Sequence, residues 1–169
     1  MTTSRRHPIH TMEETLVGPQ ATEALGARIA QLSKERYAAR ALVFLVGDLG
    51  MGKTTLTRGL LRSLGYSDAV KSPTYTLLES YELADWQIFH FDLYRVADPL
   101  ELEFVGIDEI IDGPGLKLIE WPERAADWLP APDIQITLTL GDPVEGEPVL
   151  PQVDESQSIG TRQARVDLF

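Results

Sequence analysis

The sequence predicts an α/β fold, with a mostly parallel β-sheet flanked by helices and an antiparallel hairpin at the C-terminal end. Short apolar runs alternate with segments whose apolar residues recur at helical spacing, a pattern typical of strands and helices in such folds. One apolar run leads through a glycine-rich loop straight into a leucine-striped segment. At 169 residues the chain has the length of one domain, which we expect to span residues 1–169.

The first elements follow from hydrophobic spacing. Leu25, Ile29 and Leu32 recur at helical intervals and predict a helix over residues 21–36. Residues 41–46 are continuously apolar, which is typical of a central strand covered on both faces. The leucine-striped segment 53–65 predicts the next helix, with a glycine at its end. Before these elements, residues 1–12 are expected to be disordered.

Later segments complete the predicted sheet. Residues 86–94 and 115–121 predict two further strands, and residues 99–111 predict one helix with Asp98 as its N-cap. The antiparallel hairpin is expected from residues 133–141 and 161–169. The connecting residues 142–160 are rich in Pro, Gly and Glu and are expected to form a mobile loop.

The glycine-rich loop matches the phosphate-binding pattern G-x-x-x-x-G-K-[ST]. Glycines let consecutive N–H groups curl around phosphate oxygens, and the following helix adds the positive end of its dipole. Lys53 is expected to reach the β- and γ-phosphates, and Thr54 to offer its hydroxyl to Mg²⁺. The sheet is therefore expected to be P-loop NTPase-like. The loop residues expected to bind the nucleotide are Asp48, Leu49, Gly50, Met51, Gly52, Lys53, Thr54 and Thr55.

A magnesium-bound triphosphate needs an acidic residue at a nearby strand end, and two residues fit. Asp92 and Glu120 each lie near the end of a predicted strand. Because ligands of such sheets bind at the carboxyl ends of the strands, both side chains are expected beside the glycine loop. The sequence leaves open which acid contacts the metal, and either alone could be an ordinary exposed carboxylate.

Composition excludes several classes of function. The chain has no cysteine, so disulfides, thiolate metal sites and cysteine nucleophiles are excluded. The histidines His7, His10 and His90 are scattered, predict no metal site and are interpreted as structural or solvated. The longest apolar run is too short to cross a bilayer, and no apolar core of signal-peptide length follows the basic N-terminus. We expect a cytoplasmic protein without membrane contact.

Two further absences bear on the kind of nucleotide chemistry. The chain contains no asparagine, so the Asn-Lys-x-Asp base selector of GTPases is missing. A small-molecule kinase usually needs an arginine-rich lid over its acceptor. Residues 81–169 hold only Arg95, Arg124, Arg162 and Arg165. An Mg²⁺-dependent ATPase therefore fits better than a GTPase or a kinase.

The distribution of charge bears on partners. The net charge is −11; residues 1–80 carry +3 and residues 81–169 carry −14. Affinity for nucleic acid comes largely from Lys and Arg that neutralise phosphates, so this chain is poorly suited to grip RNA alone. If the protein serves an RNA, another subunit is expected to hold it. The acidity could equally serve only solubility.

Four ordered motifs resemble one known family. They are "GDLGMGKTT" (47–55), "KSPTYTLLESY" (71–81), "HFDLYRVADPLELEFVGIDE" (90–109) and "IEWPER" (119–124). Together they resemble the TsaE (YjeE) family, the bacterial P-loop ATPases of tRNA threonylcarbamoyladenosine biosynthesis. The resemblance covers about residues 20–133, with a weaker echo at "TRQARV".

The resemblance implies roles for individual residues. Thr54 and Glu120 are implied to be Mg²⁺ ligands, and Asp92 to be needed for hydrolysis, by positioning either water or the metal shell. The segment "SPTYT" is implied to be a switch-like loop that senses the γ-phosphate. Trp121 is implied to lie at the functional surface, although a packed aromatic is an equal alternative. Positions near the nucleotide base or ribose are matched by Thr22 and Arg162.

The resemblance also implies the biological role. Such proteins act with TsaD- and TsaB-like partners in forming the threonylcarbamoyl group on the adenosine beside the anticodon of tRNAs that read codons beginning with A. Their ATP cycle would reset the complex between turnovers, and tRNA would be contacted only through the complex. The alternative is a nucleotide-dependent binding or assembly module whose hydrolysis is incidental.

The missing GTPase selector generates the first testable prediction. The protein should bind ATP and ADP well and should show no preference for guanine nucleotides. A competition titration against labelled ADP measures this directly. Displacement of ADP by GTP at equal or lower concentration than by ATP would contradict the prediction.

Overall fold

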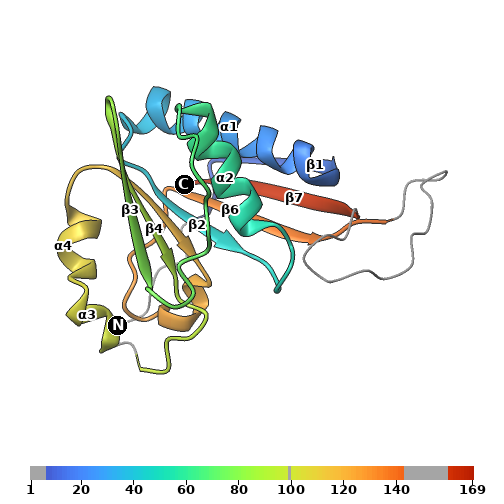
Figure 1. Cartoon of the computed structure of the whole chain (residues 1–169). Coiled ribbons are helices and arrows are strands. Elements are labelled where there is room, and N and C mark those ends of the chain that lie inside the picture. The colour runs from blue at the N-terminus through green and yellow to red at the C-terminus, as the bar shows by residue number, and fades with distance from the viewer. Residues whose placement is uncertain (1–6, 99, 143–159) are drawn as a thin grey trace.

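The computed structural model describes residues 7–98, 100–142 and 160–169, which form one mixed sheet with helices (Figure 1). The seven strands lie in the order β1-β7-β6-β2-β5-β4-β3. The strands are β1 (His10–Val17), β2 (Leu42–Val46), β3 (Leu78–Leu83), β4 (Trp86–Asp92), β5 (Leu116–Glu120), β6 (Ile134–Leu140) and β7 (Thr161–Leu168). The helices are α1 (Gly18–Tyr37), α2 (Lys53–Ser63), α3 (Glu101–Phe104), α4 (Ile107–Asp112) and the 3₁₀ helix η1 (Pro122–Ala125).

Strand direction divides the sheet into a parallel centre and antiparallel edges. The central strands β6, β2, β5 and β4 run parallel to one another. At one edge β3 pairs antiparallel with β4, and at the other β7 pairs antiparallel with β6 and with β1. The predicted α/β class and the antiparallel C-terminal strands are therefore confirmed. No helix in the described parts of the chain is long and apolar enough to span a membrane.

Both outermost strands, β1 and β3, were absent from the sequence prediction. The expected disorder over residues 1–12 is wrong for residues 10–12, which begin β1 and pair with the end of β7. The reason is that β1 is held by an edge ladder whose side chains face mostly outward, so it shows no apolar alternation. Residues 1–6 lie outside the described residues, as does nearly all of the expected mobile loop 142–160, from residue 143 to 159.

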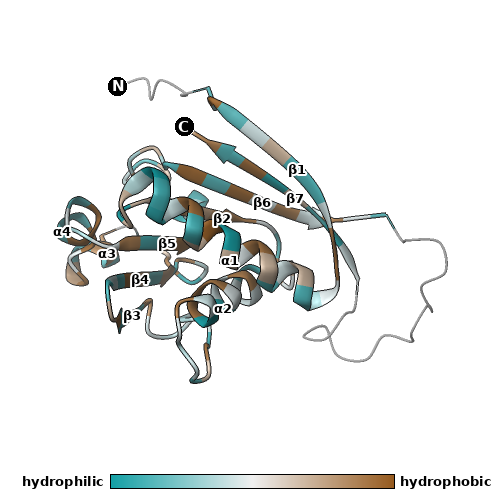
Figure 2. Ribbon diagram, turned by 90° about the horizontal axis from the view of Figure 1, so that it is seen from above, coloured by the Kyte–Doolittle hydropathy of each residue, from teal (hydrophilic) through white to brown (hydrophobic). Residues whose placement is uncertain are grey.

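The alternation of side chains in the central strands builds a core on each face of the sheet. Val43 and Leu45 of β2 point toward the cluster that also contains the buried residues of α1 and α2. Leu42 and Phe44 point the other way, toward the cluster that contains the buried residues of α3, α4 and η1. Figure 2 shows α1 and α2 side by side over the sheet, with brown, hydrophobic central strands beneath them. Helices therefore cover both faces, as predicted.

The expected single helix over residues 99–111 is wrong, because the structure has two short helices there. Gly106 adopts a φ of +66° between them and acts as the N-cap of α4. This left-handed conformation interrupts a right-handed helix, and glycine adopts it without a steric penalty. The N-cap of α3 is Leu100 rather than the expected Asp98, although Oδ1 of Asp98 accepts the N–H of Leu100 at 3.0 Å. Glu101 in turn accepts the N–H of Asp98 at 3.0 Å.

The two long helices cross at a pair of glycines. A Cβ added at Gly26 of α1 would lie 2.1 Å from the carbonyl oxygen of Leu56, and one at Gly59 of α2 would lie 2.2 Å from that of Glu23. The backbones therefore pack directly against each other. At the same crossing, Arg58 and Arg62 of α2 form ion pairs with Glu23 of α1 at 2.9 and 3.0 Å. This packing holds the start of α1 beside the start of α2.

The crossing generates the second prediction. Gly59→Ala should lower the free energy of unfolding by about 1–3 kcal/mol, because the added methyl meets backbone and the helices must separate. Ser63→Ala, at an exposed position of the same helix, is the matched control and should change stability by less than about 0.5 kcal/mol. Chemical denaturation measures both. Equal stability of the two variants would show that the crossing tolerates a side chain.

Candidate functional site

The candidate site lies where the central parallel strands end. In the ladders, Glu120 at the end of β5 pairs with Leu45 of β2 on one side and with Asp92 of β4 on the other. The glycine loop begins at Gly47, directly after β2, and ends where α2 begins, at Lys53. The two predicted acids and the loop thus meet at one edge of the sheet, although both acids are nearly fully buried rather than exposed.

The loop enters α2 through Gly52, which has a φ of +99° and serves as the N-cap of the helix. No side chain among the described residues caps this helix. Its first N–H groups therefore face the loop without a side-chain acceptor, and they carry the positive end of the helix dipole. Such a helix start is suited to an anion such as phosphate.

Lys53 is the cation of the site and is only 5% exposed. Its Nζ donates to the carbonyl oxygens of Gly47 and Asp48, the latter at 2.9 Å. It also lies 4.1 Å from the ring centroid of Trp121, a cation–π contact. Burial lowers the pKa of Lys53, while the nearby carboxylates, first of all that of Glu120, oppose the shift. The ammonium group is thus held at the loop by backbone carbonyls and faces carboxylates.

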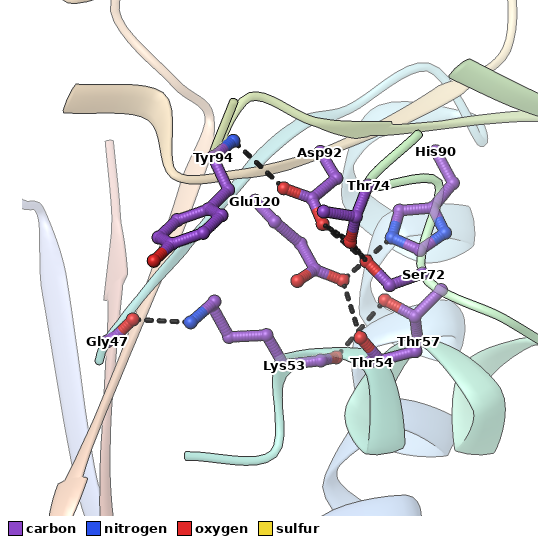
Figure 3. A network of polar contacts seen from close by, with 10 residues as sticks. All are labelled: Gly47, Lys53, Thr54, Thr57, Ser72, Thr74, His90, Asp92, Tyr94 and Glu120. Carbon is purple, nitrogen blue, oxygen red and sulfur yellow. Dashed lines mark hydrogen bonds and ion pairs between the residues drawn. The ribbon is translucent and has the colours of Figure 1, made fainter. Parts of the chain in front are cut away.

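Glu120 joins the loop helix to the sheet (Figure 3). Its Oε1 accepts the hydroxyl of Thr54 at 3.0 Å and lies 2.8 Å from Nε2 of His90. Glu120 is 3% exposed and His90 fully buried. A buried carboxylate is costly unless it is hydrogen-bonded or paired. Here the two side chains that satisfy one of its oxygens come from α2 and from β4.

Asp92 organises a second group of hydroxyls. Its Oδ2 accepts the hydroxyls of Ser72 and Thr74, the latter at 2.7 Å, and its Oδ1 accepts the N–H of Tyr94 at 2.9 Å. Figure 3 shows this group beside Glu120 and opposite the start of α2. The segment before β3 is therefore fastened to the acid at the end of β4. The two segments are 18 to 20 residues apart in the sequence, so no local sequence pattern predicts this contact.

The remaining predicted residues lie along the loop and on neighbouring elements. Thr22 of α1 is buried, and a Cβ added at Gly52 would lie 3.4 Å from its methyl carbon. Nη2 of Arg162 on β7 donates to the carbonyl of Gly50 at 3.4 Å. The other predicted positions, exposed or half-buried along the loop and the first turn of α2, are Asp48, Leu49, Gly50, Met51 and Thr55. Their roles toward a nucleotide stay predictions.

Three aromatic contacts bear on which cations reach the site. Trp121 adopts a φ of +57°, and its ring lies 4.9 Å from that of Tyr94. Arg124 lies over the ring of Tyr94 at 5.6 Å. Arg95 lies over the ring of the exposed Tyr75 at 4.3 Å and also donates to its hydroxyl. The two arginines closest in sequence to the acids therefore contact tyrosines, and Trp121 packs between Lys53 and Tyr94.

Sequence reasoning missed two members of the site, His90 and Tyr94. A lone histidine in a strand carries no pattern that would distinguish a site residue from a structural or solvated one. Its one available signal was its spacing, because the alternation of β4 places His90 on the same face as Asp92. Tyr94 was also missed, since its part in the site begins with a backbone N–H that any residue could supply.

The donor set fits Mg²⁺ and a nucleotide phosphate. Mg²⁺ prefers hard oxygen ligands and is commonly bound by one or two carboxylates together with phosphate oxygens and waters. The hydroxyl of Thr54 and the carboxylate of Glu120 supply such oxygens within 3.0 Å of each other. Among the described residues there is no cluster of three or more His, Cys, Asp or Glu that could enclose a metal alone.

A strand, a glycine loop and a helix that begins with lysine and threonine, at the carboxyl edge of parallel strands, define the P-loop class of nucleotide-binding proteins. A sequence profile agrees: that of the family described as "Threonylcarbamoyl adenosine biosynthesis protein TsaE" matches residues 16–145. The chain belongs to this TsaE family.

Individual relatives bear out this membership. The tRNA threonylcarbamoyladenosine biosynthesis protein TsaE of Haemophilus influenzae is 43% identical over 135 residues, which cover 79% of this chain and 85% of that protein. The protein of the same name from Bacillus subtilis is 36% identical and is matched over 72% of this chain and 73% of its own. The crystal structure of Bacillus subtilis YdiB is similar in fold, with a TM-score of 0.68 and 24% identity; the match covers 97% of this chain and 90% of that one.

The hydroxyls on Asp92 generate the third prediction. The double variant Ser72→Ala/Thr74→Ala should release residues 71–77 and speed their backbone hydrogen exchange, because each hydrogen bond to a charged group contributes about 1.5–3 kcal/mol. Thr76→Ala is the matched control, since Thr76 is exposed and its hydroxyl donates to the exposed Glu79 at 3.1 Å. Exchange followed by mass spectrometry separates the two. Equal exchange in both variants would show that Asp92 does not hold this segment.

Proposed function

We propose that this protein is the ATP-binding and ATP-hydrolysing subunit of a system that forms threonylcarbamoyladenosine in tRNA. Membership of the TsaE family supports the pathway. The observation that carries the ATPase assignment is the 3.0 Å contact between Thr54 and Glu120, directly beside the buried Lys53 at the loop. The nucleotide is proposed to be ATP because the chain contains no asparagine for a guanine selector.

Each polar side chain of the site has a part in this proposal. The N–H groups at the start of α2 and the ammonium group of Lys53 would bind and orient the phosphates. Thr54 and Glu120 would hold Mg²⁺, which would neutralise negative charge on the phosphates. Asp92 would orient the attacking water from the other side of Glu120. Thr22 and Arg162, which lie beside the loop, would contact the base or ribose.

The hydrogen bonds from Ser72 and Thr74 to Asp92 suggest how a change in the bound nucleotide would alter the surface that a partner contacts. A change at Asp92 would be transmitted to the segment that carries the exposed Tyr75. The proposed partners are TsaD- and TsaB-like proteins, with tRNA contacted through them. Because residues 81–169 carry a charge of −14, the chain itself offers little to a phosphate backbone.

The arrangement of cations argues for slow hydrolysis by the isolated chain. Arg95 and Arg124 contact tyrosine rings rather than the loop. An arginine that neutralises the transferring phosphoryl group contributes about 10³–10⁵ in rate and is often supplied by a partner. Docking would raise the rate by supplying a cation or by ordering residues 71–77.

The fourth prediction tests hydrolysis and its coupling together. Phosphate release by the isolated chain should be slow and should rise when the TsaB–TsaD-like pair is added at matched salt. Glu120→Gln should lower the stimulated rate by at least about 10- to 100-fold, the range found even for outer partners of metal ligands. Its ADP affinity, which depends mainly on the loop and Lys53, should change little.

The control for this prediction is Glu123→Gln, an exposed acid three residues further along the chain. Equal rates with and without the pair would contradict the coupling. Normal hydrolysis by Glu120→Gln together with inactive Asp92→Asn would reverse the roles of the two acids. If neither variant hydrolyses ATP and yet both support tRNA modification, the alternative function, a nucleotide-dependent assembly module, replaces this one.

A further inference from the structure

His90 is a buried polar side chain that the proposed function has not used. It lies on β4 between Ile88 and Asp92, on the same face of the strand, and is 0% exposed. Its Nδ1 has no hydrogen-bond partner among the described residues. A buried polar atom left without a hydrogen-bond partner destabilises the fold. An apolar side chain would fill this space without that cost, so packing alone does not explain an imidazole here.

The other ring nitrogen accounts for the imidazole. Nε2 of His90 lies 2.8 Å from Oε1 of Glu120, the oxygen that also accepts the hydroxyl of Thr54 (Figure 3). In its carboxylate form Glu120 only accepts hydrogen bonds, so Nε2 of His90 is assigned as the donor of this contact. Among the described residues, Oε2 of Glu120 receives no side-chain hydrogen bond. His90 thus fixes one oxygen of Glu120 and leaves the other for a ligand.

The two donors to Oε1, Thr54 and His90, differ in whether they are themselves expected to bind the metal. Thr54 stands on α2 and is itself an expected Mg²⁺ ligand. His90 stands on β4, whose register against β5 pairs His90 with Leu118 and Asp92 with Glu120. The imidazole is therefore positioned by the sheet, and its hold on Glu120 does not depend on the loop or on α2.

We propose that His90 is a positioning residue that orients the Glu120 carboxylate for the magnesium ion of the bound nucleotide. This inference rests on the proposed function and adds a residue to it. Partners of this kind, which hold a metal ligand without touching the metal, typically contribute 10- to 100-fold in metal affinity. The contribution comes from a carboxylate held in one orientation before the metal arrives.

The test is the affinity for Mg²⁺, measured by calorimetric titration of MgCl₂ into the protein saturated with ADP. His90→Gln retains an amide N–H near the position of Nε2 and should stay within about threefold of the wild type. His90→Asn is shorter and cannot reach Glu120, and His90→Leu has no donor. Both should weaken Mg²⁺ binding by about 10- to 100-fold. ADP affinity in EDTA should be the same in all of them.

The matched control is Ile88→Val, a fully buried position two residues earlier on the same face of β4. It removes one buried methyl group without removing a donor and should bind Mg²⁺ as the wild type does. If His90→Leu does not fold, His90→Asn carries the comparison.

The outcomes separate this inference from the function on which it rests. Mg²⁺ affinities of His90→Asn and His90→Leu equal to that of Ile88→Val would overturn the role of His90 and leave the proposed function standing. A wild-type ADP complex without measurable Mg²⁺ affinity would overturn the metal site itself, and the role of His90 with it. Loss in Asn and Leu together with retention in Gln would establish the positioning role.

Discussion

The parallel register of β2, β5 and β4 is the constraint on which the site depends. It places Glu120 beside Leu45 on one side and beside Asp92 on the other. A shift of one residue in either ladder would turn a carboxylate to the opposite face of the sheet, toward the core formed with α3 and α4. The glycine loop can meet both acids only because it leaves β2 at this same edge.

The charged groups at this edge are buried, and the surrounding elements offset the cost. Lys53 is held by two loop carbonyls and an indole face, Glu120 by a hydroxyl and an imidazole, and Asp92 by two hydroxyls and a backbone N–H. These partners come from the loop, from α2 and β4, and from the segments before β3, after β4 and after β5. Several separate parts of the fold therefore meet at the site. A change in the contacts to a bound ligand can thus shift more than one of these elements.

The sequence predicts those helices and strands whose conformation follows from the local pattern of apolar residues. The apolar runs of β2 and β5 and the leucine stripe of α2 identified the central layer and the loop helix. The edge strands could not be found, because β1 and β3 expose most of their side chains and owe their conformation to pairing. The break at Gly106 was missed for a related reason, since an isolated glycine is tolerated inside a helical pattern until packing decides its conformation.

The residues of the candidate site likewise fall into those that the sequence predicts and those that it does not. Lys53 and Thr54 follow from a local motif, and the two acids follow from strand ends in a parallel sheet. The contact of His90 with Glu120 and the fastening of Ser72 and Thr74 to Asp92 join segments 18 to 30 residues apart. Spacing along β4 can indicate that His90 and Asp92 share a face, but which side chains meet them appears only in the three-dimensional structure.

The central claim is that Thr54 and Glu120 hold the magnesium ion of a bound nucleotide. A crystal structure with a non-hydrolysable ATP analogue and Mn²⁺ in place of Mg²⁺ tests it most directly, because the anomalous signal of manganese locates the ion independently of the surrounding density. The account predicts one anomalous peak within coordination distance of the Thr54 hydroxyl and the Glu120 carboxylate, next to phosphates at the start of α2. A peak bound by Asp92 without Glu120, or a nucleotide seated away from the loop, would contradict it.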